Sequence, residues 1–180
     1  MLDHFRHPRN VGKIEHPDGT ATVGSLACGD ALQFQFKLGP DGRIAEAKFQ
    51  TFGCASAIAS SSALTEMVIG KTLDEAKQIT NKQIADYLGG LPPQKMHCSV
   101  MGREAMEAAI KNYETGENTD RNLEDQTLCT CYNVSENEVR RVIVENQLTT
   151  VEEVTNYTKA GGGCGRCRGK IEAILKELGR

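Results

Sequence analysis

The stretch that decides the fold is 31–52, ALQFQFKLGPDGRIAEAKFQTF, which is typical of a β-hairpin. Apolar and polar side chains alternate over 32–38, and this is the period of a half-buried strand. The turn sequence Gly39-Pro-Asp-Gly42 follows, and the alternation then resumes at Ala45, Ala47 and Phe49. The sequence therefore predicts two antiparallel strands, and we expect a further short strand before Cys28.

Downstream of the hairpin, the spacing of apolar residues changes to that of helices. One helix is expected from Ala55, and a second follows Thr72-Leu-Asp-Glu75, whose pattern is that of a capping box. After Leu91-Pro-Pro93, the apolar spacing predicts a third helix from about Cys98 to Tyr113. Strands followed by helices predict an α+β domain, with a small antiparallel sheet and packed helices, over residues 1–115.

The remainder of the chain has a different character. Residues 116–127 are polar and acidic with almost no apolar periodicity, which is typical of a linker. At roughly 50 residues, 128–180 is of a size at which a hydrophobic core alone is marginal and a metal often helps. Capping-box patterns at Ser135–Glu138 and Thr150–Glu153, and apolar spacing over 171–178, predict helices. We therefore expect a small all-α domain.

Composition excludes several classes of function. Lys plus Arg number 21 against 24 Asp plus Glu, aromatic residues make up 5%, and Trp is absent, so the footprint of a nucleic-acid-binding protein is missing. The charged start, 1–10, lacks the apolar core of a secretory signal, and the longest charge-free run, 49–65, is too polar to span a membrane. We expect a cytoplasmic protein that binds neither nucleic acid nor membrane.

Cysteine is the informative residue type. The chain has seven, and an odd number without an export signal favours metal ligands or reactive thiols over disulfides. The predicted linker divides them into a set of three and a set of four. The first set is Cys28, Cys54 and Cys98, and the second is Cys129, Cys131, Cys164 and Cys167.

The second set forms a C-x-C and a C-x-x-C pattern, and four thiolates brought together suit either tetrahedral zinc or an iron-sulfur cluster. A glycine run, 161–163, precedes Cys164, and it would let backbone N–H groups approach the sulfurs of a cluster. A structural zinc site stays an alternative. A thiol redox motif is disfavoured because it would leave Cys129 and Cys131 unexplained. With this spacing, the segment resembles the bacterioferritin-associated ferredoxin-like domain, which implies a permanent 2Fe-2S cluster on these four cysteines.

The first set lies in three loop-like contexts, with Asp30 two residues after the first cysteine and His97 directly before the last. Cys54 and Cys98 fall where helices are expected to begin, and the positive end of a helix dipole favours the thiolate. Asp30 or His97 as a fourth ligand would make one position harder and more exchangeable. Inert core cysteines are the alternative, and a hydrolase-like Cys98–His97 pair is disfavoured because adjacent helical residues rarely face each other.

Three further histidines, His4, His7 and His16, are expected to be surface residues of an N-terminal helix and turn.

Taken together, the thiol contexts, Asp30, and Leu91-Pro-Pro93 ahead of His97 resemble the IscU-type iron-sulfur scaffold. With the second segment, nearly the whole chain resembles a NifU-type scaffold protein. The resemblance implies a transient cluster on Cys28, Cys54 and Cys98, built from iron and from sulfur that a cysteine desulfurase delivers, and then passed to apo-proteins. It also implies zinc in the scaffold site of purified protein, a homodimer, and an assembly scaffold rather than a turnover enzyme.

Two departures from the family pattern are visible. Relatives that depend on a dedicated chaperone carry Leu-Pro-Pro-Val-Lys, whereas Gln94 stands here in the place of Val, which argues against that dependence. Full-length NifU proteins also end in a third domain with its own C-x-x-C, and this sequence stops at Arg180. It is therefore expected to be either a shorter relative or a truncated form.

The residues suggest a mechanism. A thiolate of lowered pKa attacks the desulfurase persulfide, and we expect Cys98 to be the acceptor, with His97 as its proton partner. Asp30 is expected to keep the assembled cluster labile, and the permanent cluster is expected to supply electrons that reduce the sulfane sulfur. The rival functions are a pure electron carrier, which leaves the first cysteine set without a role, and a zinc-stabilised interaction module.

Overall fold

Residues 1–25, 30–117 and 127–180 of the computed structural model are described below. They belong to two compact units, residues 1–91 with 98–121 and residues 92–97 with 122–180. Cys28 and most of the predicted linker lie outside the described residues. Within the described ranges, no helix combines the length and apolar character needed to cross a bilayer.

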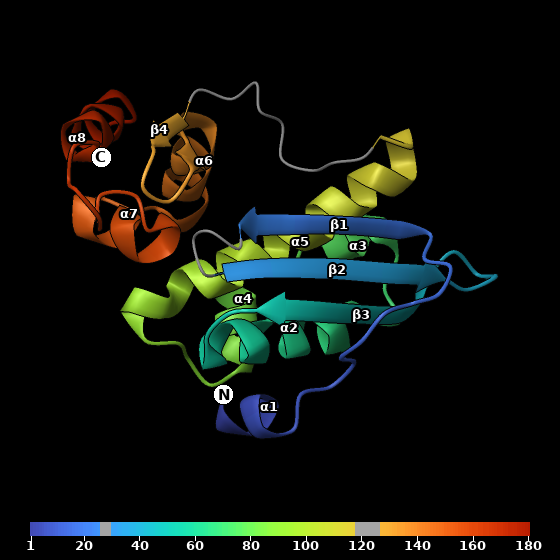
Figure 1. The fold of residues 1–180 in the computed structure, drawn as a ribbon. Helices are drawn as coiled ribbons and strands as arrows, with labels where there is room; N and C mark the ends of the chain where they lie inside the picture. Colours follow the sequence, from blue (N-terminus) through green and yellow to red (C-terminus); the bar gives the residue numbers. More distant parts are fainter. Residues whose placement is uncertain (26–29, 118–126) are drawn as a thin grey trace. The chain divides into compact units, whose positions relative to one another are not determined.

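The first unit combines three strands with helices. The antiparallel sheet has the order β1-β2-β3, and α2 to α5 lie on one side of it (Figure 1). This arrangement confirms the predicted α+β class. The elements are α1 (Leu2–Arg6), β1 (Gly19–Ser25), β2 (Asp30–Leu38), β3 (Ile44–Phe52), α2 (Ala55–Val68), α3 (Leu73–Lys77), α4 (Asn81–Tyr87) and α5 (Met96–Thr115). The first two residues of α5 belong to the second unit. The Thr72–Glu75 capping box is present at the start of α3.

The predicted hairpin is formed by β2 and β3. Phe34 pairs with Phe49 in an antiparallel register, and both side chains are buried. The register shifts at Leu38, which pairs with Ile44 rather than with Ala45. This irregularity turns Ile44 into the core and leaves Ala45 exposed, so the expectation that Ala45 continues the inward face is wrong.

The core of this unit lies between the sheet and the helices. It is formed by one face of β1 to β3 and by the apolar sides of α2 to α5, and burying each large side chain contributes about 1.5–3 kcal/mol. Close approach of α5 to β1 requires Gly19, because a Cβ there would come within 2.5 Å of the Ala109 carbonyl oxygen and 2.3 Å of the Phe36 ring. The largest buried members are Leu32, Phe34, Phe36, Ile44, Phe49, Leu64, Ile84, Met106 and Ile110.

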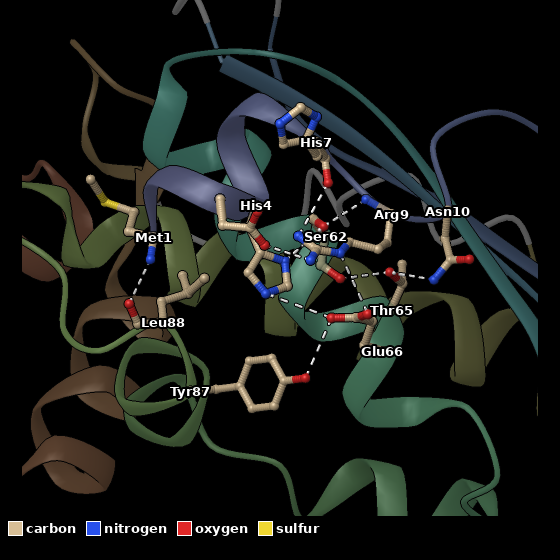
Figure 2. A network of polar contacts seen from close by, with 11 residues as sticks. Met1, His4, His7, Arg9, Asn10, Ser62, Thr65, Glu66, Tyr87 and Leu88 are labelled. Atoms are coloured by element: carbon tan, nitrogen blue, oxygen red, sulfur yellow. Dashed lines mark hydrogen bonds and ion pairs between the residues drawn. The ribbon is translucent and has the colours of Figure 1, made fainter.

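The N-terminal segment is fastened to α2 by polar contacts (Figure 2). His4 Nδ1 lies 2.9 Å from Ser62 Oγ, and the same hydroxyl accepts the Arg9 backbone N–H at 2.9 Å. His4 Nε2 lies 3.6 Å from a Glu66 oxygen, to which the Tyr87 hydroxyl also donates. Only 12% of the His4 side chain is exposed, so its expected surface position is wrong, and burial lowers its pKa.

The other two N-terminal histidines, His7 and His16, are exposed as predicted.

The second unit combines a two-stranded hairpin with helices around a small core. The two strands are antiparallel. Because the unit contains this hairpin in addition to its helices, the prediction of an all-α domain is incomplete. Thr150 and Glu153 form the predicted capping box, and the Ser135 hydroxyl accepts the Glu138 N–H. The main elements are β4 (Thr127–Cys129), β5 (Val134–Ser135), α6 (Glu136–Asn146), α7 (Val151–Thr158) and α8 (Arg168–Glu177), with the short 3-10 turn η2 (Pro93–Lys95) in the same unit. Its buried side chains include Val139, Ile143, Val154, Ile171 and Ile174.

Candidate metal centres

In the first unit, two of the predicted thiols come together. Cys54 is the residue before the first turn of α2, and Cys98 is the third residue of α5, so both lie at helix starts as predicted. Their sulfurs are 3.6 Å apart, although 43 residues separate them in the sequence. Cys98 is buried and Cys54 is partly exposed. The helix N-termini that hold them favour thiolates, which are the forms that bind metals and attack sulfur.

Asp30 lies near the residue before Cys54. It is the first residue of β2, and its carboxylate approaches Gly53, which precedes Cys54. A Cβ at Gly53 would lie 2.9 Å from Asp30 Oδ1 and 3.1 Å from the Ala57 side chain. Glycine at this position therefore leaves the room that the carboxylate occupies. The structure thus places a carboxylate near the residue that precedes Cys54.

His97 is partly buried as the second residue of α5 and is followed directly by Cys98. Cys28, the third predicted thiol of this set, lies outside the described residues. The described part of the predicted site therefore consists of Cys54, Cys98, the nearby Asp30 carboxylate and His97, which precedes Cys98 in the chain.

In the second unit, the four cysteines meet as two pairs. Cys131 Sγ lies 3.4 Å from Cys164 Sγ, and the thiol of Cys129 is hydrogen-bonded to that of Cys167. Cys129 ends β4 and Cys167 directly precedes α8, and both are buried. Cys131 and Cys164 are exposed. Each pair joins one cysteine of the C-x-C pattern to one of the C-x-x-C pattern.

A glycine loop lets these pairs form. A Cβ at Gly163 would come within 3.0 Å of the Cys131 Cβ and 3.1 Å of its sulfur. Gly161 has φ +88°, a backbone conformation that favours glycine. The glycine run therefore permits the close approach to the sulfurs that the sequence suggests.

The two pairs differ in electrostatics. The pKa of the Cys164 thiol is lowered to about 7, chiefly because the Arg166 side chain donates a hydrogen bond to its sulfur, with Nε 3.3 Å from Sγ. Burial raises the pKa of the Cys167 thiol. Arg166 was not singled out from the sequence, although its position between the two cysteines of the C-x-x-C pattern is a signal that could have identified it.

The donor set fits an iron-sulfur cluster. 2Fe-2S clusters in proteins are held by four thiolates, with two protein ligands for each iron. The four thiols of the second unit also lie in two pairs. Across residues 1–25, 30–117 and 127–180, no three or more His, Cys, Asp or Glu side chains converge as ligands of one metal ion. The free thiols, rather than disulfides, are the forms that such a cluster requires.

Comparison with protein families matches both units. Residues 1–120 match the family described as NifU-like N terminal domain, and residues 127–177 match the BFD-like 2Fe-2S binding domain. The nitrogen fixation protein NifU of Trichormus azollae is 55% identical over 187 residues, covering 99% of this chain and 62% of that protein. This chain therefore spans less than two thirds of that relative.

Shorter relatives match the first unit. The iron-sulfur cluster assembly scaffold protein IscU 1 of Archaeoglobus fulgidus is 55% identical, covering 63% of this chain and 73% of that protein. Among solved structures, a scaffold protein for the SUF system from Fervidobacterium islandicum matches with a TM-score of 0.50 and 25% identity, over 61% of this chain and 92% of that chain. The structure of the N-terminal part of a NifU-like protein of Brucella abortus shares the fold, with a TM-score of 0.51 and 23% identity, over 64% of this chain and 92% of that chain.

Proposed function

This chain belongs to the NifU-like family of iron-sulfur scaffolds, and from that premise we propose that it builds a transient cluster in its first unit and transfers it to apo-proteins. The observation that carries the proposal is the Cys54–Cys98 pair, with the Asp30 carboxylate near Gly53, the residue before Cys54. Thiolates bind the irons of a cluster strongly, whereas a carboxylate is a harder ligand that binds them less tightly and is replaced more readily. A scaffold needs both properties, because its cluster is cargo.

Sulfur arrives by thiol exchange. The thiolate of the proposed acceptor, Cys98, attacks the outer sulfur of a persulfide on a cysteine desulfurase. A new S–S bond forms on Cys98, the desulfurase S–S bond breaks, and the desulfurase cysteine leaves as a thiolate. His97, the preceding residue, would hold the proton that Cys98 gives up. With the Cys54 sulfur 3.6 Å away, the sulfane sulfur can pass between the two cysteines.

A resident 2Fe-2S cluster would be held in the second unit by Cys129, Cys131, Cys164 and Cys167. Such a cluster supplies single electrons when bound, and reducing one persulfide to sulfide and thiol takes two electrons. The protein contributes the thiol pairs, the glycine loop and the Arg166 hydrogen bond. We propose that this unit serves the first as its electron source.

Other parts of the proposal concern the whole molecule. We propose a non-enzymatic scaffold and carrier that acts as a homodimer in the cytoplasm, with a domain boundary at the predicted linker. Zinc in the Cys28, Asp30, Cys54, His97 and Cys98 site is proposed for protein purified without iron. The sequence departure at Gln94 leads us to propose transfer without the dedicated chaperone.

One experiment tests the function. The chain is purified anaerobically, its absorption spectrum and its iron, sulfide and zinc contents are measured, and it is then incubated with a cysteine desulfurase, cysteine and ferrous iron. We expect about two irons per chain at purification, additional iron and sulfide after incubation, and transfer of that addition to an apo-ferredoxin. A protein that holds zinc without iron and gains no cluster would contradict the proposal.

A further inference from the structure

Arg166 gives two hydrogen bonds to a single sulfur. Its side-chain Nε lies 3.3 Å from Cys164 Sγ, and its backbone N–H also hydrogen-bonds to that sulfur. The residue is exposed and lies in the turn that joins Cys164 to the start of α8. N–H donors aimed at a ligating sulfur are a principal means by which a protein tunes an iron-sulfur cluster.

The guanidinium of Arg166 also places a fixed positive charge beside two of the four thiols. Its Nε lies 3.3 Å from Cys164 Sγ, and Cys164 Sγ lies 3.4 Å from Cys131 Sγ. Arginine stays protonated throughout the physiological range, so this charge does not depend on pH. The Cys129–Cys167 pair is buried instead. One side of the ligand set is therefore exposed and electropositive, and the other is enclosed.

This asymmetry has a consequence for reduction. A 2Fe-2S cluster on four thiolates carries net negative charge, and reduction adds one more. A nearby positive charge and N–H donors stabilise the more negative state more than the less negative one, so they raise the reduction potential. We propose that Arg166 is a positioning residue that raises the reduction potential of the cluster in the second unit, acting through the Cys164 and Cys131 thiolates. This rests on the proposed resident cluster.

The test uses the full chain and a redox titration. The variants are Arg166→Ala, which removes the charge and the side-chain donor, and Arg166→Gln, which removes the charge but keeps an N–H donor. The control is Lys170→Gln, which removes an equally positive side chain from the exposed part of α8. The titration is run at about 0.15 M ionic strength, where the Debye length of about 8 Å limits the influence of remote charges.

We expect Arg166→Ala to make reduction about tenfold less favourable, which for a one-electron couple is a lowering of the midpoint by about 59 mV. Arg166→Gln should fall between Arg166→Ala and the parent chain, and Lys170→Gln should change the equilibrium constant less than twofold. Iron content and visible absorption are measured on the same samples, because a merely structural role would change these and leave the potential of the remaining cluster unaltered.

These outcomes distinguish a failure of the Arg166 proposal from a failure of the proposed resident cluster. If the parent chain has no 2Fe-2S spectrum, the resident cluster itself is refuted and the role of Arg166 with it. If the cluster is present and Arg166→Ala and Arg166→Gln both titrate at the parent potential, the resident cluster stands and the role of Arg166 is refuted. If Arg166→Ala loses its cluster, the potential of Arg166→Gln is compared with that of Lys170→Gln instead. A potential of Arg166→Gln that is no lower than that of Lys170→Gln overturns the proposal.

Discussion

The two units bring cysteines together by opposite means. Cys54 and Cys98 lie at the starts of two long helices that pack on a three-stranded sheet, and the Asp30 carboxylate lies near the residue before Cys54. Cys131 and Cys164 lie in exposed loops of a small unit, and an arginine accompanies them. In the first unit, a large core positions the thiols without help from a metal. In the second unit the core is small, and we expect the binding of a cluster by the four cysteines to hold its loops together.

This contrast matches the proposed roles of the two units, in which the first carries a cluster as cargo and the second keeps one as a resident cofactor. A hard carboxylate beside thiolates adds negative charge and an exchangeable ligand, which suits a site that must release its cluster. An arginine and a glycine loop add N–H donors and positive charge, which suit a site that must keep its cluster and accept electrons.

Replacing a ligand of the second unit should remove both its cofactor and much of its structure. In Cys131→Ala, we expect the loss of about two irons per chain, of visible colour, and of the helical circular dichroism of α6 to α8, since metal binding to small sites contributes on the order of 10 kcal/mol to folding. Iron analysis and far-ultraviolet circular dichroism measure this. Cys54→Ala is the matched control and should keep both signals. Unchanged helicity in the iron-free variant would show that the second core suffices without its cluster.

Replacing a thiol of the first unit should remove assembly but leave its fold. Cys98→Ala and Cys54→Ala are each expected to abolish desulfurase-driven cluster formation, while the absorption of the second unit persists, because the two thiol sets lie in separate compact units.

Mass spectrometry of the desulfurase reaction identifies the acceptor. The parent chain and Cys54→Ala should gain the mass of one sulfur atom, and Cys98→Ala should not. Persulfide formation at the parent rate in Cys98→Ala would move the acceptor role to another cysteine.

Replacing Asp30 should alter release rather than assembly. Without the carboxylate, Asp30→Ala loses an exchangeable ligand and a negative charge, so we expect it to load iron and sulfide normally and to transfer them several-fold more slowly to an apo-ferredoxin. Stopped-flow absorption measures the transfer. Asp30→Asn keeps hydrogen bonding but not the charge, so transfer by this variant at the parent rate would mean that Asp30 acts only in the turn.

Removing one helix cap should give the smallest effect. Thr150 and Glu153 close a capping box at the start of α7, and Thr150→Ala is expected to destabilise the second unit by about 1 kcal/mol. Thermal unfolding measures the difference, and Thr72→Ala, which removes the corresponding box from α3, is the matched variant in the first unit. Unchanged stability in Thr150→Ala would contradict the prediction.

The same cap predicts a dependence on pH. The pKa of Glu153 is lowered, chiefly by the hydrogen bond that its carboxylate accepts from the Thr149 backbone N–H, and also by that from Thr150. A group whose pKa is lower in the folded state stabilises the fold above its unfolded pKa, and this contribution is lost as the pH falls through the folded pKa. Glu153→Gln should therefore show a weaker fall in stability on acidification than the parent chain, and equal acid sensitivity would contradict the assignment.

Local patterns predicted most of the secondary structure for identifiable reasons. The strand over 32–38 could be predicted because the side chains of a half-buried strand alternate with a period of two residues. The helix starts at Thr72 and Thr150 could be predicted because a capping box depends on residues only three positions apart. The register shift at Leu38 could not be predicted from local alternation. It places Ile44 rather than Ala45 in the core, and only the pairing of the two strands determines which of the two residues faces inward. His4 was misread because its contact with Ser62 spans 58 residues of chain.

The sequence by itself determined the cysteine patterns, their division into two sets and the kind of chemistry they perform, because ligand type and short spacing are properties of neighbouring residues. Only the tertiary structure decided that Cys54 meets Cys98, that the carboxylate of Asp30 approaches Gly53, and that each cysteine of the C-x-C pattern pairs with one of the C-x-x-C pattern. It also decided that Arg166 turns toward Cys164. These contacts depend on the packing of whole elements and the path of loops, and no local spacing specifies either.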